Sequence, residues 1–186
     1  AVSSAAIAQK KYDTGADDKE IKVGNIMPYS GPASAYGTIG KAIGAYFDKV
    51  NAEGGVNGRK LRLISLDDGY NPAKALEQTR RLVENDEVLL IFNTVGTATN
   101  LATHRYLNSR KVPQLLIMSG ANRWNDPKNF PWTVGGMLSY DAEARMYTRH
   151  LLETVKDPRI AVLSQNDDFG RDFVQGLKGQ LGDRAR

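Results

Sequence analysis

Paired carboxylates and histidines are the side chains in this sequence with the clearest potential for chemistry. Asp67–Asp68 follow an apolar run, where two carboxylates could hold Mg²⁺ or act as a general acid and base. They also stand just before Asn71–Pro72, a pair typical of a helix start, so we interpret them as a turn. His104 and His150 lie in helical patterns without a second histidine at metal-ligand spacing. We therefore expect exposed helical histidines, no metal and no cofactor.

Motifs for nucleotide binding or nucleophilic catalysis are incomplete. Gly40–Lys41 suggest a phosphate-binding loop, but such a loop needs glycine at Ala35 and serine or threonine at Ala42. No G-x-G-x-x-G follows an expected strand, and Ser119 lies in IMSGA rather than in a G-x-S-x-G elbow. The chain has no cysteine, which excludes thiolate chemistry and disulfides. We expect a binding protein and not an enzyme.

Three expected loops share an unusual composition. The segments 28–38, 93–100 and 119–122 each follow an expected strand, and none contains a charged residue. Two of them lead into helix starts, where free backbone N–H groups and the helix dipole attract anions. Ordinary turn chemistry explains any one such loop. Three at one sheet edge favour a site that holds a carboxylate with neutral donors.

A strand–helix rhythm must position these loops. Apolar runs predict strands at 21–27, 60–66, 87–92, 112–118 and 159–164. Helical spacing predicts helices after Tyr36, from Asn71–Pro72, from about Thr99 to Arg110, from Asp141, and after Asp167–Asp168. This alternation indicates an α/β fold with a doubly wound, mostly parallel sheet. Between 119 and 140 the rhythm breaks, apart from a short extended piece around PWTV. The 159–164 strand either joins the first sheet or belongs to a second lobe.

Periodicity also predicts which side chains of the helices face inward. The stripe of the second helix comprises Leu76, Thr79 and Val83, and that of the third comprises Leu101, Ala102 and Tyr106.

Composition excludes several partners. The 186 residues are 41% hydrophobic with a net charge of +4, but the basic residues are scattered and no aromatic residues interleave with them. We expect solvated faces and no nucleic acid. No stretch approaches the ~20 apolar residues of a membrane span. The small and polar residues at 1–20 suggest a flexible mature N-terminus, the tail of a removed leader, or a cloning remnant.

Several segments together resemble a known family, the periplasmic solute-binding proteins of ABC importers in the branched-chain amino acid class. They are IKVGNIMPYSGPASAYG, NAEGGVNGRKLRLISLDDGYNPAKALEQTRRLVE, NTVGTATN, KVPQLL, SGANRW and LLETVKDPRIAVLSQNDDFGRDF, which cover most of 21–176 in the family's order. The resemblance implies a type I periplasmic-binding fold, of which this chain is the N-terminal portion. Residues 1–20 would be a flexible segment, 21–138 the first lobe, and 139–186 the crossover and the start of a second lobe.

The resemblance also implies the ligand-binding residues. The loops after the third and fourth strands would hold the solute through Val95, Gly96 and Thr97, and through Ser119, Gly120, Ala121 and Asn122. Tyr36 matches an aromatic residue that closes over the ligand, and Phe169 matches one from the second lobe. Family members often have tyrosine at the latter position. Amino acid binders have serine or cysteine where this chain has Val95–Gly96.

The implied function is that of an extracytoplasmic receptor. It would capture a small carboxylate-bearing solute (a branched-chain amino acid, or an aromatic or other small organic acid) by closure of two lobes. It would be a periplasmic monomer that delivers its solute to the membrane permease of an ABC importer. A ligand-sensing domain of a regulator or receptor is the alternative, and a Rossmann-like enzyme is a more distant one. We expect the 186 residues alone to bind the solute weakly.

Overall fold

Five parallel strands form the sheet of the computed structural model, which describes residues 11–185. Their order is β2-β1-β3-β4-β5. The strand after β1 is added on one side of β1 and the later strands on the other side, so the strand order reverses at β1. The strands are β1 (Glu20–Met27), β2 (Lys60–Asp67), β3 (Leu90–Phe92), β4 (Gln114–Ile117) and β5 (Thr133–Gly135). The predicted α/β class and parallel sheet are confirmed.

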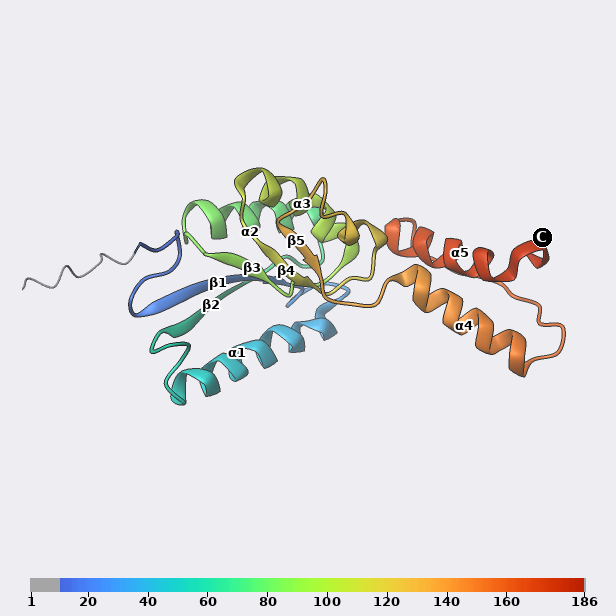
Figure 1. Ribbon diagram of the computed structural model, residues 1–186, viewed down its shortest axis with the longest axis horizontal. Coiled ribbons are helices and arrows are strands. Elements are labelled where there is room, and N and C mark those ends of the chain that lie inside the picture. Colours follow the sequence, from blue (N-terminus) through green and yellow to red (C-terminus); the bar gives the residue numbers. More distant parts are fainter. Residues whose placement is uncertain (1–10, 186) are drawn as a thin grey trace, which may run out of the picture.

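Helices cover both faces of this sheet. Figure 1 shows α1 on one face, α2 and α3 on the other, and α4 and α5 side by side beyond the sheet. The α-helices are α1 (Gly37–Ala52), α2 (Pro72–Glu84), α3 (Thr97–Arg110), α4 (Tyr140–Thr154) and α5 (Asp168–Leu181). Short 3₁₀ helices are η1 (Ser34–Tyr36), η2 (Asn122–Asn125) and η3 (Gly182–Arg184). None of the helices within 11–185 is long and apolar enough to cross a membrane.

The main core lies between the sheet and the pair α2 and α3. Its buried residues come from β1, α2, β3, α3 and the loop before β3, and they are Ile26, Ala75, Leu82, Val88, Ile91 and Leu107. Asn71 begins α2 as predicted, because its side chain accepts hydrogen bonds from the N–H groups of Ala73 and Lys74. The core contacts pack α2 and α3 against β1 and β3.

The inward face of α3 differs from the prediction. Its buried residues are Thr97, Thr99, Asn100, Thr103, His104 and Leu107, whereas Leu101, Ala102 and Tyr106 are only partly buried. Several of these inward polar residues hydrogen-bond to one another, although His104 Nε2 and Gln114 Oε1 have no partner among the described residues. Asn100 Oδ1 accepts hydrogen bonds from Thr94 Oγ1 and from Gln114 Nε2, the latter at 2.8 Å. Hydrophobic spacing alone could not anticipate this network.

The expected strand at 159–164 is not formed. Val162 is about half exposed and Leu163 is fully exposed. A strand needs a neighbour for its backbone N–H and C=O groups, and no strand within 11–185 lies beside this segment. The segment around PWTV, which was predicted as a short extended piece, forms β5 instead and pairs with β4 at the edge of the sheet.

The described part of the N-terminal segment forms backbone hydrogen bonds with the start of β1. Residues 1–10 of the predicted flexible segment lie outside the described residues. In the remainder, Lys22 N–H donates to Gly15 O at 2.7 Å, and Asp17 N–H donates to Glu20 O at 3.0 Å. Gly15 has φ +83°, and a Cβ there would lie 2.1 Å from Leu89 N. Glycine therefore allows this turn to pack closely against the start of β3.

Candidate solute site

A pocket of about 600 Å³ opens beside the carboxyl ends of β1, β3 and β4. Ligands of open α/β sheets bind at this edge, next to the point where the strand order reverses. None of the described residues that line the pocket is charged. They are Pro32, Ala33, Tyr36, Ile39, Tyr70, Val95, Thr97, Met118, Met137, Tyr140, Gln165 and Phe169. The site therefore combines an apolar wall with a few neutral polar groups.

Aromatic rings make much of the pocket wall. Tyr36 comes from η1 and is 57% exposed, so it can cover a solute without reorganising a core. Tyr70 has φ +58°, an uncommon conformation for a residue with a side chain. Burial raises the pKa of the Tyr70 hydroxyl above its usual value. Phe169 enters from the start of α5.

The start of α3 supplies the polar end of the pocket. Gly96 is the N-cap residue and gives α3 no side-chain hydrogen bond. The first N–H groups of a helix have no partner within it, so here they are left to water or a solute. Gly96 has φ +106°, and a Cβ would lie 2.5 Å from Tyr70 Cε2. Glycine thus lets the aromatic wall approach the helix start.

Thr97 and Ser119 bring the predicted loops after β3 and β4 together. Their hydroxyl oxygens lie 2.8 Å apart, and both residues are almost completely buried. Trp124 Nε1 donates a hydrogen bond to Ser119 Oγ at 3.0 Å. Thr97 lines the pocket, whereas Ser119 and Trp124 stand behind it. The geometry can hold an anionic or carbonyl oxygen with neutral donors.

The other predicted site residues lie next to the pocket without lining it. Gly120 faces Leu138 O and the ring of Tyr140, and a Cβ would lie 2.3 Å from that oxygen. Ala121 is buried in a cluster with Trp124. Asn122 N–H donates to Asp172 Oδ2 at 2.8 Å, a contact between η2 and α5. A direct role in ligand binding stays a prediction for these three residues and for the predicted residues that line the pocket.

Sequence reasoning missed several lining residues. Tyr70 follows β2, whose loop contains the acidic pair and so did not share the uncharged pattern. Met118 directly follows β4, and Tyr140 and Gln165 come from segments outside the three loops. An aromatic residue next to Gly69, ahead of the Asn71 helix cap, was the one available signal for Tyr70.

The acidic pair forms the predicted turn before α2. Tyr70 N–H donates to Asp68 Oδ1 at 2.9 Å, and Asn71 N–H donates to Asp68 O. Hydrogen bonds from Lys74 and Ser30 hold the pKa of Asp67 well below its usual value. Burial raises the pKa of Asp68, whose Oδ2 has no hydrogen-bond partner among the described residues. Asp67 thus stabilises α2 and the loop after β1, and Asp68 stabilises the turn before α2.

His104 is not an exposed histidine, which corrects the prediction, whereas His150 is exposed as expected. The imidazole of His104 is 2% exposed and stacks on Phe130 with ring centroids 4.0 Å apart. Trp124 meets it edge to face at 5.1 Å. Burial lowers the pKa of His104 to about 4. Residues 11–185 contain no group of three histidine, cysteine or acidic side chains that could hold a metal ion.

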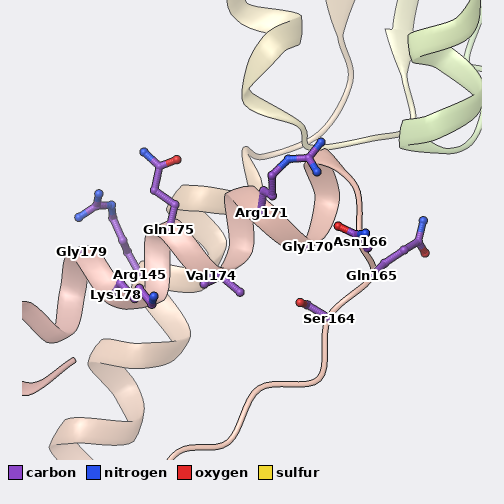
Figure 2. Close-up of a pocket in the computed structure, with 10 residues that line it drawn as sticks. All are labelled: Arg145, Ser164, Gln165, Asn166, Gly170, Arg171, Val174, Gln175, Lys178 and Gly179. Carbon is purple, nitrogen blue, oxygen red and sulfur yellow. The ribbon is translucent and has the colours of Figure 1, made fainter. Parts of the chain in front are cut away.

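A second hollow, of about 780 Å³, lies between α4, α5 and the 164–166 segment. Figure 2 shows that its side chains do not converge on one point: Arg171, Gln175 and Gln165 point in different directions. Arg171 is paired with Asp168, and Arg145 with Asp141. Burial alone would raise the pKa of Asp168, but hydrogen bonds from Arg171 and Arg123 outweigh it and lower this pKa. The pocket at the sheet edge is the better candidate.

Comparisons with known proteins identify the family of the chain. Residues 20–183 match a family model described as periplasmic binding protein. The leucine-specific-binding protein of Salmonella typhimurium is 25% identical over 95% of this chain and 48% of its own length. The chain spans about half the length of the curated relatives it matches.

Solved structures share the fold. The crystal structure of a possible leucine/isoleucine/valine-binding protein from Rhodopirellula baltica has a TM-score of 0.81 and 28% identity, over 91% of this chain and 46% of that chain. A solute binding protein of an ABC transporter from Rhodopseudomonas palustris, in complex with 3,4-dihydroxybenzoic acid, has a TM-score of 0.77 and 23% identity, over 88% and 44%. The chain therefore belongs to the periplasmic binding protein family, and its fold is that of the N-terminal portion of a type I periplasmic-binding protein.

Proposed function

We propose that this chain carries the solute-binding surface of an extracytoplasmic receptor for an ABC importer, and that the solute is a small carboxylic acid. The observation that carries the proposal is the uncapped start of α3, with Thr97, at one end of an aromatic pocket. Helix N-termini attract anions, and the aromatic wall suits an apolar body. Leucine and 3,4-dihydroxybenzoic acid, which the relatives' descriptions name, combine these two features.

The proposed mechanism is capture without chemistry. The carboxylate accepts hydrogen bonds from the first N–H groups of α3 and from Thr97, while Tyr36 and Phe169 contact the apolar part. A membrane permease of the importer would then receive the solute from a periplasmic, monomeric receptor. The pocket offers no charged lining residue among those described, so a solute amine would need an acid from elsewhere.

A thermal-shift experiment tests the proposal. Leucine and 3,4-dihydroxybenzoate are each added to the 186-residue chain and to the Thr97→Val variant. A ligand at about 100 times its Kd stabilises a protein by about 2.7 kcal/mol, so at least one acid should raise the melting temperature of the wild type. The same acid should raise that of the variant much less. Equal shifts in both proteins would place the carboxylate somewhere other than Thr97.

A further inference from the structure

Ser119 Oγ is the centre of a buried hydrogen-bond chain that ends at the pocket. Within the described residues it lies 2.8 Å from Thr97 Oγ1, 3.0 Å from Trp124 Nε1 and 3.4 Å from the backbone N of Ala121. Ser119 is 1% exposed, Thr97 2% and Trp124 4%. Water therefore has little access to Ser119 and Trp124, which do not line the pocket, so their hydrogen bonds must be satisfied within this group. Thr97 does line the pocket and can also bind a group there.

The directions of these hydrogen bonds follow from donor and acceptor chemistry. An indole N–H and a backbone N–H can only donate, so Ser119 Oγ accepts from Trp124 and from Ala121. Of its three neighbours, Thr97 Oγ1 alone can accept the Ser119 hydroxyl hydrogen. If Thr97 donated to Ser119 instead, the hydrogen of Ser119 would be buried without an acceptor, an arrangement that proteins avoid. Ser119 therefore donates to Thr97, and the hydrogen of Thr97 is left for the pocket.

The indole of Trp124 keeps its orientation independently of Ser119. Its ring lies edge to face with His104, at an interplanar angle of 88°, and it packs in a buried cluster with Ile117 and Ala121. The indole N–H is thus aimed by packing, and the two hydroxyl groups adapt to it. Trp124 therefore donates to Ser119, Ser119 donates to Thr97, and Thr97 can donate into the pocket.

We propose that Trp124 is a positioning residue that makes Thr97 a hydrogen-bond donor toward the solute. The solute group at that point must then be an acceptor oxygen, of a carboxylate or a carbonyl, and not an amine or ammonium. Trp124 does not line the pocket, so it acts through Ser119. This inference rests on the proposed function, because it specifies how the same pocket selects its solute.

A double-mutant cycle tests this hydrogen-bond relay, which runs from Trp124 through Ser119 to Thr97. Affinities for leucine and 3,4-dihydroxybenzoate are measured by calorimetry on the 186-residue chain and on Trp124→Phe, Thr97→Val and the double variant. Trp124→Phe should weaken binding about fivefold, which corresponds to about 1 kcal/mol for one hydrogen bond. The same change should have almost no effect when residue 97 is already valine. Trp132→Phe is the matched control, because Trp132 is 37% exposed and outside the chain of hydrogen bonds.

If Trp124 supported binding only through its packing, the double-mutant cycle would give different affinity changes. If Trp124→Phe weakens binding equally with threonine or valine at 97, or does not weaken it at all, the relay is wrong while the proposed function stands. If the wild type binds neither acid, the proposed function fails and the inference fails with it. Should Trp124→Phe not fold, benzothienylalanine at 124 keeps the ring shape without the N–H, and the same fivefold loss is expected. Ser119→Ala, which removes the middle of the relay, should match it.

The relay also has a readout that needs no ligand. The two tryptophans give two indole N–H signals in an NMR spectrum of the free protein. Ser119→Ala should shift the Trp124 signal, because it removes the acceptor, and should leave the Trp132 signal in place. An unchanged Trp124 signal would contradict the hydrogen bond on which the relay depends.

Discussion

The rings of Tyr140 and Phe169 meet edge to face, with centroids 4.7 Å apart, although 28 positions separate them in the sequence. Tyr140 begins α4 and Phe169 lies in the first turn of α5. Both line the pocket, so the contact joins the pair α4 and α5 to the site at the sheet edge. Phe169 is 36% exposed, which leaves part of its ring free for a solute.

Substitutions of Phe169 should show whether its ring contributes to solute binding. Phe169→Ala removes an aromatic wall, and we expect the affinity for a carboxylate probe to fall about tenfold, or about 1.4 kcal/mol. Phe169→Tyr keeps the ring and should retain most of the affinity. Calorimetry on both variants checks this. An alanine variant that binds as the wild type does would remove Phe169 from the site.

Gly96→Ala should damage the site through a steric clash. The new Cβ would lie 2.5 Å from Tyr70 Cε2 and 2.7 Å from Thr99 Oγ1, at φ +106°. Gly54 is a matched control because it has φ +105° with nothing within 4 Å. Gly54→Ala should cost about 1 kcal/mol of unfolding free energy from backbone strain alone. Gly96→Ala should cost clearly more and weaken solute binding. Urea unfolding compares the two, and equal losses would mean that the close approach has no energetic role.

The free energy of unfolding should fall as the pH drops through the range in which His104 is protonated in the unfolded chain but not in the folded protein. Its pKa is about 4 in the folded protein against 6.5 in the unfolded chain. Below pH 6.5 the unfolded state binds a proton that the folded state does not, so acid favours unfolding. Between pH 7 and 5 this histidine should account for about 2 kcal/mol. The raised pKa of Asp68 acts with the opposite sign.

The variant His104→Phe isolates this effect. Phenylalanine can stack on Phe130 and does not titrate, so the variant should lose about 2 kcal/mol less than the wild type between pH 7 and 5. The free energy of unfolding in urea, measured at both pH values, gives the difference. The same pH dependence in both proteins would show that His104 is accessible to protons when folded.

Asn25 holds the ends of three strands together. It is fully buried, its Nδ2 donates to Phe92 O at 2.7 Å, and its Oδ1 accepts from Ser65 Oγ at 2.7 Å. Asn25→Asp replaces the donor with a carboxylate oxygen facing a carbonyl, and we expect a loss of about 3 kcal/mol at neutral pH. Asn57→Asp, at an exposed turn, should change stability by less than about 0.5 kcal/mol. Chemical denaturation of both variants tests the contrast.

The sequence predicted those parts of the fold that depend on local patterns. Four of the five expected strands formed, and the Asn71 cap lies where its chemistry indicated. The segment at 159–164 has strand-like residues but no neighbouring strand among those described, and pairing is a property of the sheet rather than of the segment. The inward face of α3 was misassigned because Asn100 forms a hydrogen bond with Gln114 of β4, a contact between elements that hydrophobic spacing does not show.

The site was predictable only in part for the same reason. Uncharged loops identified the region of Thr97 and Ser119, because composition is visible in a sequence. The contact of Tyr140 with Phe169, and the hydrogen bond from Trp124 to Ser119, depend on where η2, α4 and α5 pack. No local pattern carries that information.

The most direct test of solute binding at the start of α3 is an NMR titration of the ¹⁵N-labelled chain with leucine and with 3,4-dihydroxybenzoate. Millimolar affinities are measurable in this way, so even weak binding is detected. We predict saturable shifts of the Gly96, Thr97 and Ser119 amide signals with at least one acid, and none at Gly179, which lines the hollow in Figure 2. Shifts confined to Gly179 and its neighbours, or no saturable shift with either acid, would contradict the account.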